Sequence, residues 1–225
     1  RWATPDTPML PLRHDWTLPS IATPGALAAW LGVSDAQLEG FADLAGLNRS
    51  ADARLRHYRV RWVAKSSGGW RAIEAPKPAL EALQRKVLDE IVGAIPAHRA
   101  AHGFVRGRSA ITHARAHSGR AFVMRFDLAE FFTSVHATLV RAIFREASFP
   151  DAVAARLAGL CTARTSREDL RRRPDASAGD ARSKRLREPH LPQGAPTSPA
   201  LANLALFRLD RRLHALALAF GATYT

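Results

Sequence analysis

Hydrophobic and polar residues alternate along residues 58–64, where Tyr, Val and Trp are separated by Arg. The pattern resumes over residues 70–75, after the segment Lys65-Ser-Ser-Gly-Gly69. A period of two is typical of a strand with one buried face, and a short glycine-containing connection is typical of a hairpin turn. These residues therefore predict a β-hairpin whose glycine-rich tip carries Lys65.

A helical period begins directly after this hairpin. The apolar side chains of residues 78–95 recur three or four positions apart, at Leu80, Leu83, Val87, Leu88 and Ile91. This spacing places them on one face of an amphipathic helix. Ser34 has the side chain expected of an N-cap. Shorter patterns predict helices over residues 20–31, 34–47, 110–117, 137–147, 151–162 and 203–219.

Two further stretches favour extended backbone. Residues 120–128 form a β-rich run that ends at Asp127, and residues 221–225 have the composition of the start of another strand. Residues 1–19 contain several prolines without any period and predict an irregular arm. The mixture of helices and strands predicts an α+β fold.

A strongly charged segment spans residues 164–187. It holds nine Lys or Arg and four Asp or Glu, with Gly and Pro but few large apolar residues. This composition predicts an exposed insertion, which either clamps RNA or is a solvated, partly disordered loop, and we favour the loop.

The composition indicates a polyanionic partner. In 225 residues, 33 Lys and Arg oppose 20 Asp and Glu, which gives a formal net charge of +13. The electrostatic field of such a charge attracts nucleic acid at long range. The alternative is that the Ala- and Arg-rich composition reflects a GC-rich genome and that the charge merely keeps the protein soluble. The 47% of hydrophobic residues is enough for a substantial core.

The single cysteine, Cys161, excludes an internal disulfide and a cysteine-based zinc site, and is expected to be a buried small residue. No uncharged apolar run is long enough for a membrane span. The chain starts at Arg1 without a signal peptide, so we expect a cytoplasmic protein whose ends have been trimmed.

Two motifs occur in a fixed order and carry the main resemblance. Residues 126–132 read Phe-Asp-Leu-Ala-Glu-Phe-Phe, and residues 191–199 read Leu-Pro-Gln-Gly-Ala-Pro-Thr-Ser-Pro and lead on to Asn203. The chain resembles bacterial reverse transcriptases, and among them those of retrons, from about residue 58 to its end. Residues 71–76 and 102–109 are similar to the two fingers motifs of this family.

The resemblance implies a right-hand polymerase fold without its thumb. Residues 1–57 would be the N-terminal arm and short helices, residues 58–120 the fingers, and residues 121–225 the first half of an RRM-like palm with the insertion at 164–187. The family's Tyr-x-Asp-Asp turn is expected just beyond Tyr224. One feature departs from the retron pattern, because His113-Ala-Arg-Ala-His117 lacks the Asn that begins the Asn-Ala-x-x-His signature.

Asp127 is the candidate catalytic metal ligand. A polymerase palm holds two divalent metal ions with hard oxygen ligands, and the resemblance implies Mg²⁺ at the Asp127 carboxylate and the Leu128 carbonyl. A helix cap is the alternative role for Asp127. Of the two rings that follow, we expect Phe131 in the core and Phe132 under the ribose, where it excludes a 2′-hydroxyl; both rings in the core is the alternative.

Four residues are candidates for binding the nucleotide beside Phe132. Gly194 permits a close backbone approach after a proline-fixed turn, and Gln193 precedes it. The resemblance places Lys65 and Arg71 over the β- and γ-phosphates, where charge develops during transfer. Solvated cations on an exposed hairpin are the alternative for Lys65 and Arg71.

Several basic residues are candidates for binding the RNA template. His113 and His117 lie one helical turn apart, but they lack the nearby Glu and the third ligand of a zinc hydrolase. Hydrogen bonds to a template phosphate or a 2′-hydroxyl are the favoured role. The candidates are Arg106, Arg108, His113, Arg115 and His117.

The function implied is RNA-templated DNA synthesis on a structured non-coding RNA, with an RNA–DNA duplex and dNTPs bound and an effector protein as partner in phage defence. As an incomplete N-terminal portion, the chain alone is expected to be inactive. Two other functions stay open: a catalytically inactive RNA-binding scaffold with a polymerase fold, and a group II intron maturase.

Overall fold

The computed structural model describes residues 16–66, 68–175 and 180–225, so most of the predicted irregular arm at 1–19 lies outside the described residues. Helices dominate, with one two-stranded antiparallel sheet, as expected of an α+β protein. In chain order the elements are α1 (Pro24–Leu31), α2 (Asp35–Ala42), η1 (Asn48–Ser50), β1 (Tyr58–Ala64), β2 (Trp70–Pro76), α3 (Pro78–Glu90), η2 (Val92–Ala94), α4 (Ala110–His117), α5 (Phe131–Ser134), α6 (Ala137–Glu146), α7 (Asp151–Cys161), α8 (Arg167–Arg171), α9 (Ala181–Arg187) and α10 (Ser198–Ala219).

The predicted hairpin is confirmed. Strands β1 and β2 pair antiparallel from Tyr58 opposite Pro76 to Ala64 opposite Trp70. At the tip, the Lys65 amide donates to the Gly69 carbonyl at 2.9 Å. Gly69 has a φ of 77°, a left-handed conformation that disfavours other residues and explains the glycine at this turn.

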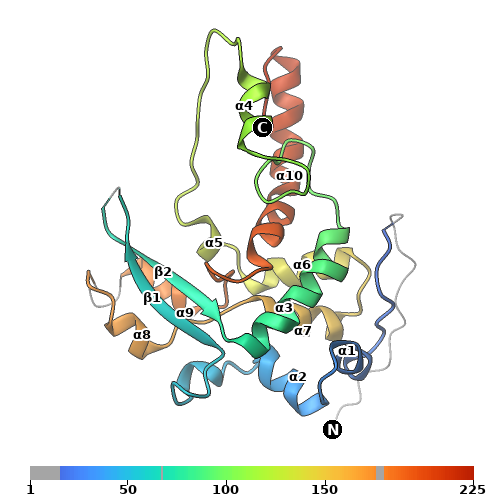
Figure 1. Cartoon of the computed structure of the whole chain (residues 1–225), viewed down its shortest axis with the longest axis vertical. Helices are drawn as coiled ribbons and strands as arrows, with labels where there is room; N and C mark the ends of the chain where they lie inside the picture. Colours follow the sequence, from blue (N-terminus) through green and yellow to red (C-terminus); the bar gives the residue numbers. More distant parts are fainter. Residues whose placement is uncertain (1–15, 67, 176–179) are drawn as a thin grey trace.

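The main core lies between the N-terminal helices and α3, α6 and α7, in the lower half of the molecule in Figure 1. Its largest fully buried side chains include Leu27, Leu38, Leu80, Phe144 and Leu157. Helices α2 and α7 cross closely, because a Cβ on Gly159 would lie only 2.2 Å from the Ala42 carbonyl oxygen. The apolar face predicted for α3 is part of this core, because Leu80, Leu83, Val87 and Ile91 are buried in it.

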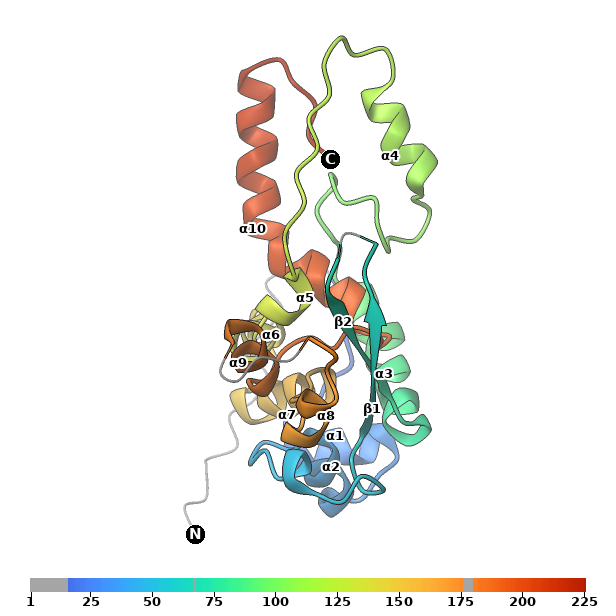
Figure 2. The ribbon, with the colours of Figure 1, turned by 90° about the vertical axis from the view of Figure 1, so that its left-hand side faces the viewer.

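The helix predictions are confirmed to within a few residues at most ends. Ser34 caps α2 as expected, in a capping box with Gln37. Four helix ends differ more: α1 begins at Pro24 rather than at 20, α2 ends at Ala42 rather than at 47, α3 ends at Glu90 with a 3₁₀ turn after it, and α10 begins at Ser198 rather than at 203. Helix α10 extends well beyond the core, toward the end of the molecule that also holds α4, and Figure 2 shows the chain that leads to α5 between these two helices (Figures 1 and 2).

The strand predicted at residues 120–128 is wrong. In the described structure these residues form an exposed, irregular segment, and Phe122, Val123, Met124 and Phe126 are largely solvent-accessible. Residues 221–225 likewise form no strand. A strand requires a hydrogen-bonded neighbour, and the described residues supply none for either segment.

The exposed loop predicted at residues 164–187 is also wrong for the part that the structure describes. This segment contains α8 and α9, and Leu170 and Leu186 are buried against Ala72 of the hairpin. Arg173 is buried as well, in ion pairs with Asp175 and Asp180. Part of the charge is thus paired within the segment, and the two leucines pack it against the sheet.

Candidate active site

A cleft of about 580 Å³ lies between the hairpin, α5 and α9. Six of the residues predicted as catalytic, metal-binding or nucleotide-binding line it: Lys65, Arg71, Asp127, Leu128, Phe132 and Gln193. They come from the hairpin, the segment before α5 and the loop before α10. The fold thus brings together residues that are far apart in the sequence.

Asp127 is free to bind a ligand. Its side chain is exposed, and it forms no hydrogen bond or ion pair with any residue in the described ranges. The alternative role as a helix cap is wrong, because Glu130 holds the N-cap position of α5 and no side chain caps this helix. An unpaired carboxylate in an open cleft can coordinate a cation.

Phe131 and Phe132 both pack against the main core and both line the cleft. Their rings meet edge to face, with centroids 6.5 Å apart. The expected division into one core ring and one site ring is therefore not seen, since each ring has a half-buried position that serves both.

The loop before α10 is fixed to the hairpin. The Gln193 carbonyl accepts a hydrogen bond from the Glu74 amide at 2.9 Å, which continues the edge of β2. Gly194 has a φ of 139°, and a Cβ there would lie 3.0 Å from the Glu74 carbonyl oxygen. The close approach that requires this glycine is to the strand β2, and it presents the Gln193 side chain to the cleft.

A buried polar network also holds the same loop against β2. Glu74 accepts a hydrogen bond from Thr165 Oγ1 at 2.7 Å and pairs with His190 Nε2 at 2.8 Å. All three side chains are almost fully buried. Burial lowers the pKa of His190, but the Glu74 carboxylate and the Glu188 carbonyl outweigh it, so the net pKa is raised.

The sequence analysis missed Glu130 and two cations of α9. Lys65 Nζ lies 3.4 Å from Glu130 Oε1, Arg182 Nη2 lies 2.7 Å from the same oxygen, and Arg185 Nη2 lies 3.7 Å from Oε2. Glu130 has a φ of 53°, which is unusual for a residue with a Cβ. Arg71 also lines the cleft, without an ion pair among the described residues.

These residues fit part of a magnesium site. The Asp127 carboxylate and the Leu128 carbonyl supply hard oxygen ligands of the kind Mg²⁺ prefers. Glu130 is engaged with cations, and no group of three or more His, Cys, Asp or Glu side chains able to hold a metal occurs within the described ranges. The described residues therefore offer one free carboxylate where a two-metal site needs several.

The predicted template-binding residues lie apart from the cleft. His113, Arg115 and His117 of α4 line a separate shallow depression, and Arg106 is exposed in the preceding loop. Arg108 is different, because its guanidinium donates to the backbone carbonyls of residues 98, 99 and 101. Arg108 therefore holds the basic loop in shape.

Other contacts fix the position of α4. The rings of His102, His113 and His117 meet edge to face in sequence, with centroids 5.6 and 5.4 Å apart. His117 Nε2 is 2.6 Å from Thr225 Oγ1. Asn203, at the end of the second motif, donates to the Gly103 carbonyl at 2.9 Å and so ties the basic loop to α10.

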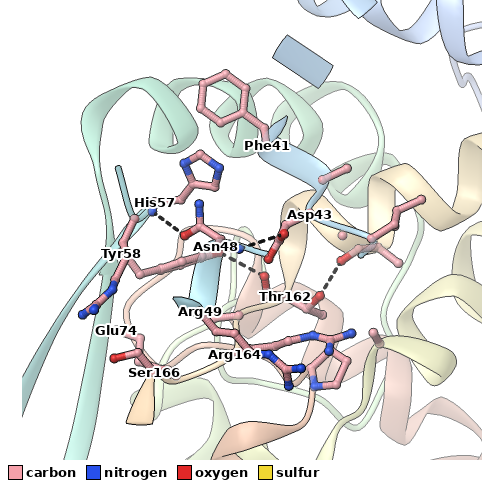
Figure 3. Close-up of a pocket in the computed structure, with 18 of the residues that line it drawn as sticks. Phe41, Asp43, Asn48, Arg49, His57, Tyr58, Glu74, Thr162, Arg164 and Ser166 are labelled. Carbon is pink, nitrogen blue, oxygen red and sulfur yellow. Dashed lines mark hydrogen bonds between the residues drawn. The ribbon is translucent and has the colours of Figure 1, made fainter. Parts of the chain in front are cut away.

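A second, smaller pocket of about 170 Å³ lies between α2, the base of the hairpin and α7 (Figure 3). It contains none of the predicted site residues. Asn48 Oδ1 accepts a hydrogen bond from the His57 amide, and the Asn48 backbone amide donates to Asp43 Oδ1. Thr162 Oγ1 donates to the Ala158 carbonyl. Polar groups in this pocket mainly join the N-terminal helices to the hairpin.

Cys161 is fully buried, as predicted, and burial raises the pKa of its thiol to about 12. It therefore stays protonated near neutral pH and is not a nucleophile.

Among the described helices, none has the length and apolar character needed to cross a bilayer.

Comparison with known proteins identifies the family of this chain. A family model described as Reverse transcriptase (RNA-dependent DNA polymerase) matches residues 63–223, which is more than half of the chain. The chain belongs to the reverse transcriptase family. Its similar curated relatives are retron enzymes, which confirms the resemblance to the bacterial retron type.

Three of these relatives define the extent of the similarity. Retron Mx65 reverse transcriptase of Myxococcus xanthus is 42% identical over 208 residues, covering 92% of this chain and 46% of the relative. Retron Mx162 reverse transcriptase of the same organism is 41% identical, covering 89% and 39%. Retron Ec86 reverse transcriptase of Escherichia coli is 30% identical, covering 78% and 47%. The chain thus spans about half or less of the length of these relatives.

Proposed function

We propose that this chain is the N-terminal portion of a retron-type reverse transcriptase that copies a structured non-coding RNA into DNA. Residues 58–120 would form the fingers and residues 121–225 the first half of the palm. A Tyr-x-Asp-Asp turn with the remaining metal ligands, and a thumb, would follow Thr225. The observation that carries the proposal is the shared cleft, in which Asp127 and Gln193 face the hairpin cations.

Each predicted site residue has a chemical task in this proposal. Asp127 and the Leu128 carbonyl hold Mg²⁺, which when bound activates the attacking hydroxyl and neutralises charge on the phosphates. Lys65 and Arg71 bind the β- and γ-phosphates, where negative charge grows during transfer. Gln193 forms part of the wall against which the nucleotide lies, and Gly194 lets the loop that carries Gln193 pack closely on β2.

Phe132 selects the sugar. Its ring lies in the cleft beside Asp127 and is supported by the core, so it cannot retreat to make room for a 2′-hydroxyl. The side chains of α4 and of the loop before it bind RNA, with Arg106, His113, Arg115 and His117 contacting phosphate or the 2′-hydroxyl. In the whole system, the enzyme and its DNA product would act with an effector protein in phage defence.

We expect Phe132→Ala to reduce discrimination against ribonucleotides about tenfold to a hundredfold, because removing the ring opens space for the 2′-hydroxyl. The measurement is steady-state incorporation of dTTP and UTP by the full-length protein on poly(rA) with an oligo(dT) primer and Mg²⁺. Thermal unfolding of the same variant separates this effect from lost core packing.

Phe220→Ala is the matched control, since Phe220 is exposed and lies outside the cleft. It should leave discrimination unchanged. If Phe132→Ala discriminated between dTTP and UTP as well as the wild type, Phe132 would not be the residue that selects the sugar. Absence of any DNA product from the wild-type protein would refute the proposed function itself and favour an RNA-binding scaffold.

A further inference from the structure

Helix α9 brings two cations to the cleft that no sequence motif indicates. Arg182 and Arg185 lie 2.7 and 3.7 Å from the two carboxylate oxygens of Glu130. Lys65 reaches the same carboxylate from the hairpin tip at 3.4 Å. Three cations from two separate elements thus converge on one carboxylate at the edge of the proposed nucleotide site.

The position of α9 is fixed by packing. Leu186, on the turn after Arg182, is 1% exposed and lies in a small apolar cluster with Ala72 of β2 and Leu170 of α8. At its other end, the Asp180 side chain caps the helix and pairs with the buried Arg173. The Arg182 guanidinium, 21% exposed, is therefore held in the lining of the cleft, and the Arg185 guanidinium, 45% exposed, lies at its edge beside Glu130.

The positive charges at this end of the cleft exceed the negative ones. Two carboxylates, those of Asp127 and Glu130, face four cations, namely Lys65, Arg71, Arg182 and Arg185. The Glu130 side chain is only 18% exposed, so these charges are less screened than surface charges. An unmatched cluster of this kind attracts a compact polyanion.

We propose that Arg182 and Arg185 bind the polyphosphate of the incoming nucleotide, and that Glu130 pairs with them until the nucleotide arrives. The inference rests on the proposed function and extends it to a part of the fold outside the family motifs. A triphosphate places several negative charges within a few ångströms, which suits cations that converge on one point. A nucleic acid backbone carries its charges singly and further apart.

Guanidinium groups suit this ligand because they donate two parallel hydrogen bonds to phosphate oxygens. Glu130 then acts as a competitor for the same donors. The proposal consequently predicts effects of opposite sign: loss of an arginine weakens polyphosphate binding, while loss of the Glu130 charge strengthens it. A network that only stabilises the fold would be damaged by either change.

The test measures binding of inorganic tripolyphosphate to the full-length protein by calorimetry, together with the KM and kcat for dTTP on poly(rA) and oligo(dT). We expect Arg182→Gln and Arg185→Gln to weaken tripolyphosphate binding and raise the KM, about tenfold in the double variant. Glu130→Gln should tighten tripolyphosphate binding about threefold. The affinity for an RNA oligonucleotide should change less than about twofold in all of them.

Arg187→Gln is the matched control, since Arg187 is an exposed residue of the same helix that makes no ion pair with the described residues. It should behave as the wild type. Weaker tripolyphosphate binding in Glu130→Gln, or unchanged binding in the arginine variants, would overturn the inference. Reduced RNA affinity with unchanged tripolyphosphate binding would overturn it in favour of a backbone contact. Because tripolyphosphate binding needs no DNA synthesis, these outcomes are separable from failure of the proposed function.

Discussion

Replacing Asp127 by asparagine is expected to lower RNA-templated DNA synthesis by about a thousandfold or more. The change removes one charge and one hard oxygen ligand from the proposed metal site, and the bound metal contributes several kcal/mol to the transition state. Asp127 forms no hydrogen bond or ion pair with another described residue, so the fold should be unaffected. The measurement is single-turnover primer extension on poly(rA) with Mg²⁺, with RNA affinity measured in parallel.

Asp89→Asn provides the matched control for this change. Asp89 is an exposed residue on α3, far from the cleft, and should leave both activity and RNA affinity at the wild-type level. If Asp127→Asn retained full synthesis, Asp127 would not be a metal ligand. If it lost RNA affinity and synthesis together, its role would lie in the fold or in RNA binding.

The second large effect concerns stability. We expect Glu74→Ala to lower the free energy of unfolding by about 3–5 kcal/mol, because it leaves His190 buried without its charged partner. Thr165 Oγ1 also loses its acceptor. Urea denaturation measures the loss. Glu90→Ala, which removes an exposed carboxylate 4.0 Å from Lys86, should cost no more than about 0.5 kcal/mol.

The same pair predicts a pH dependence of stability. His190 has a folded-state pKa above its ordinary value of 6.5, so the protonated imidazole is favoured by folding. This contribution is fully present below pH 6.5 and is lost as the pH rises through the raised pKa. Unfolding free energy should therefore fall over that range in the wild type, and Glu74→Ala should abolish the fall. An unchanged slope in Glu74→Ala would show that the fall does not arise from the His190–Glu74 pair.

Elements defined by local signals could be predicted from the sequence. The hairpin follows from a two-residue period and a glycine turn, and the start of α2 from the capping side chain of Ser34. The apolar spacing of α3 likewise needs no knowledge of the rest of the chain. In each case the residues that determine the element are neighbours in the sequence.

The strand expected at residues 120–128 could not be predicted correctly from local composition. Its composition favours extended backbone, and the backbone is in fact irregular and largely extended away from the core in Figure 2. A strand also needs a partner, and a partner is a property of the tertiary structure. Periodicity within residues 120–128 carries no information about that partner.

The charged segment at residues 164–187 was misjudged for a related reason. A run of Arg, Asp and Glu was interpreted as solvated, but Arg173 and its acidic partners satisfy one another, and two leucines are enough to bury the segment against Ala72. The contact between α9 and Glu130 could not be predicted from the sequence either, because no spacing rule links residues more than 50 positions apart. The motif residues of the cleft, by contrast, could be predicted through the family resemblance.

The central claim is that one nucleotide contacts Asp127, the hairpin tip and the Gln193 loop together. Photo-crosslinking of the full-length protein with 8-azido-dATP, followed by mass spectrometry of the modified peptides, tests it most directly. The claim predicts adducts within residues 65–71, 127–133 or 193–194 that unlabelled dATP suppresses. Adducts confined to α4, or to the smaller pocket around Asn48 and Thr162, would contradict it.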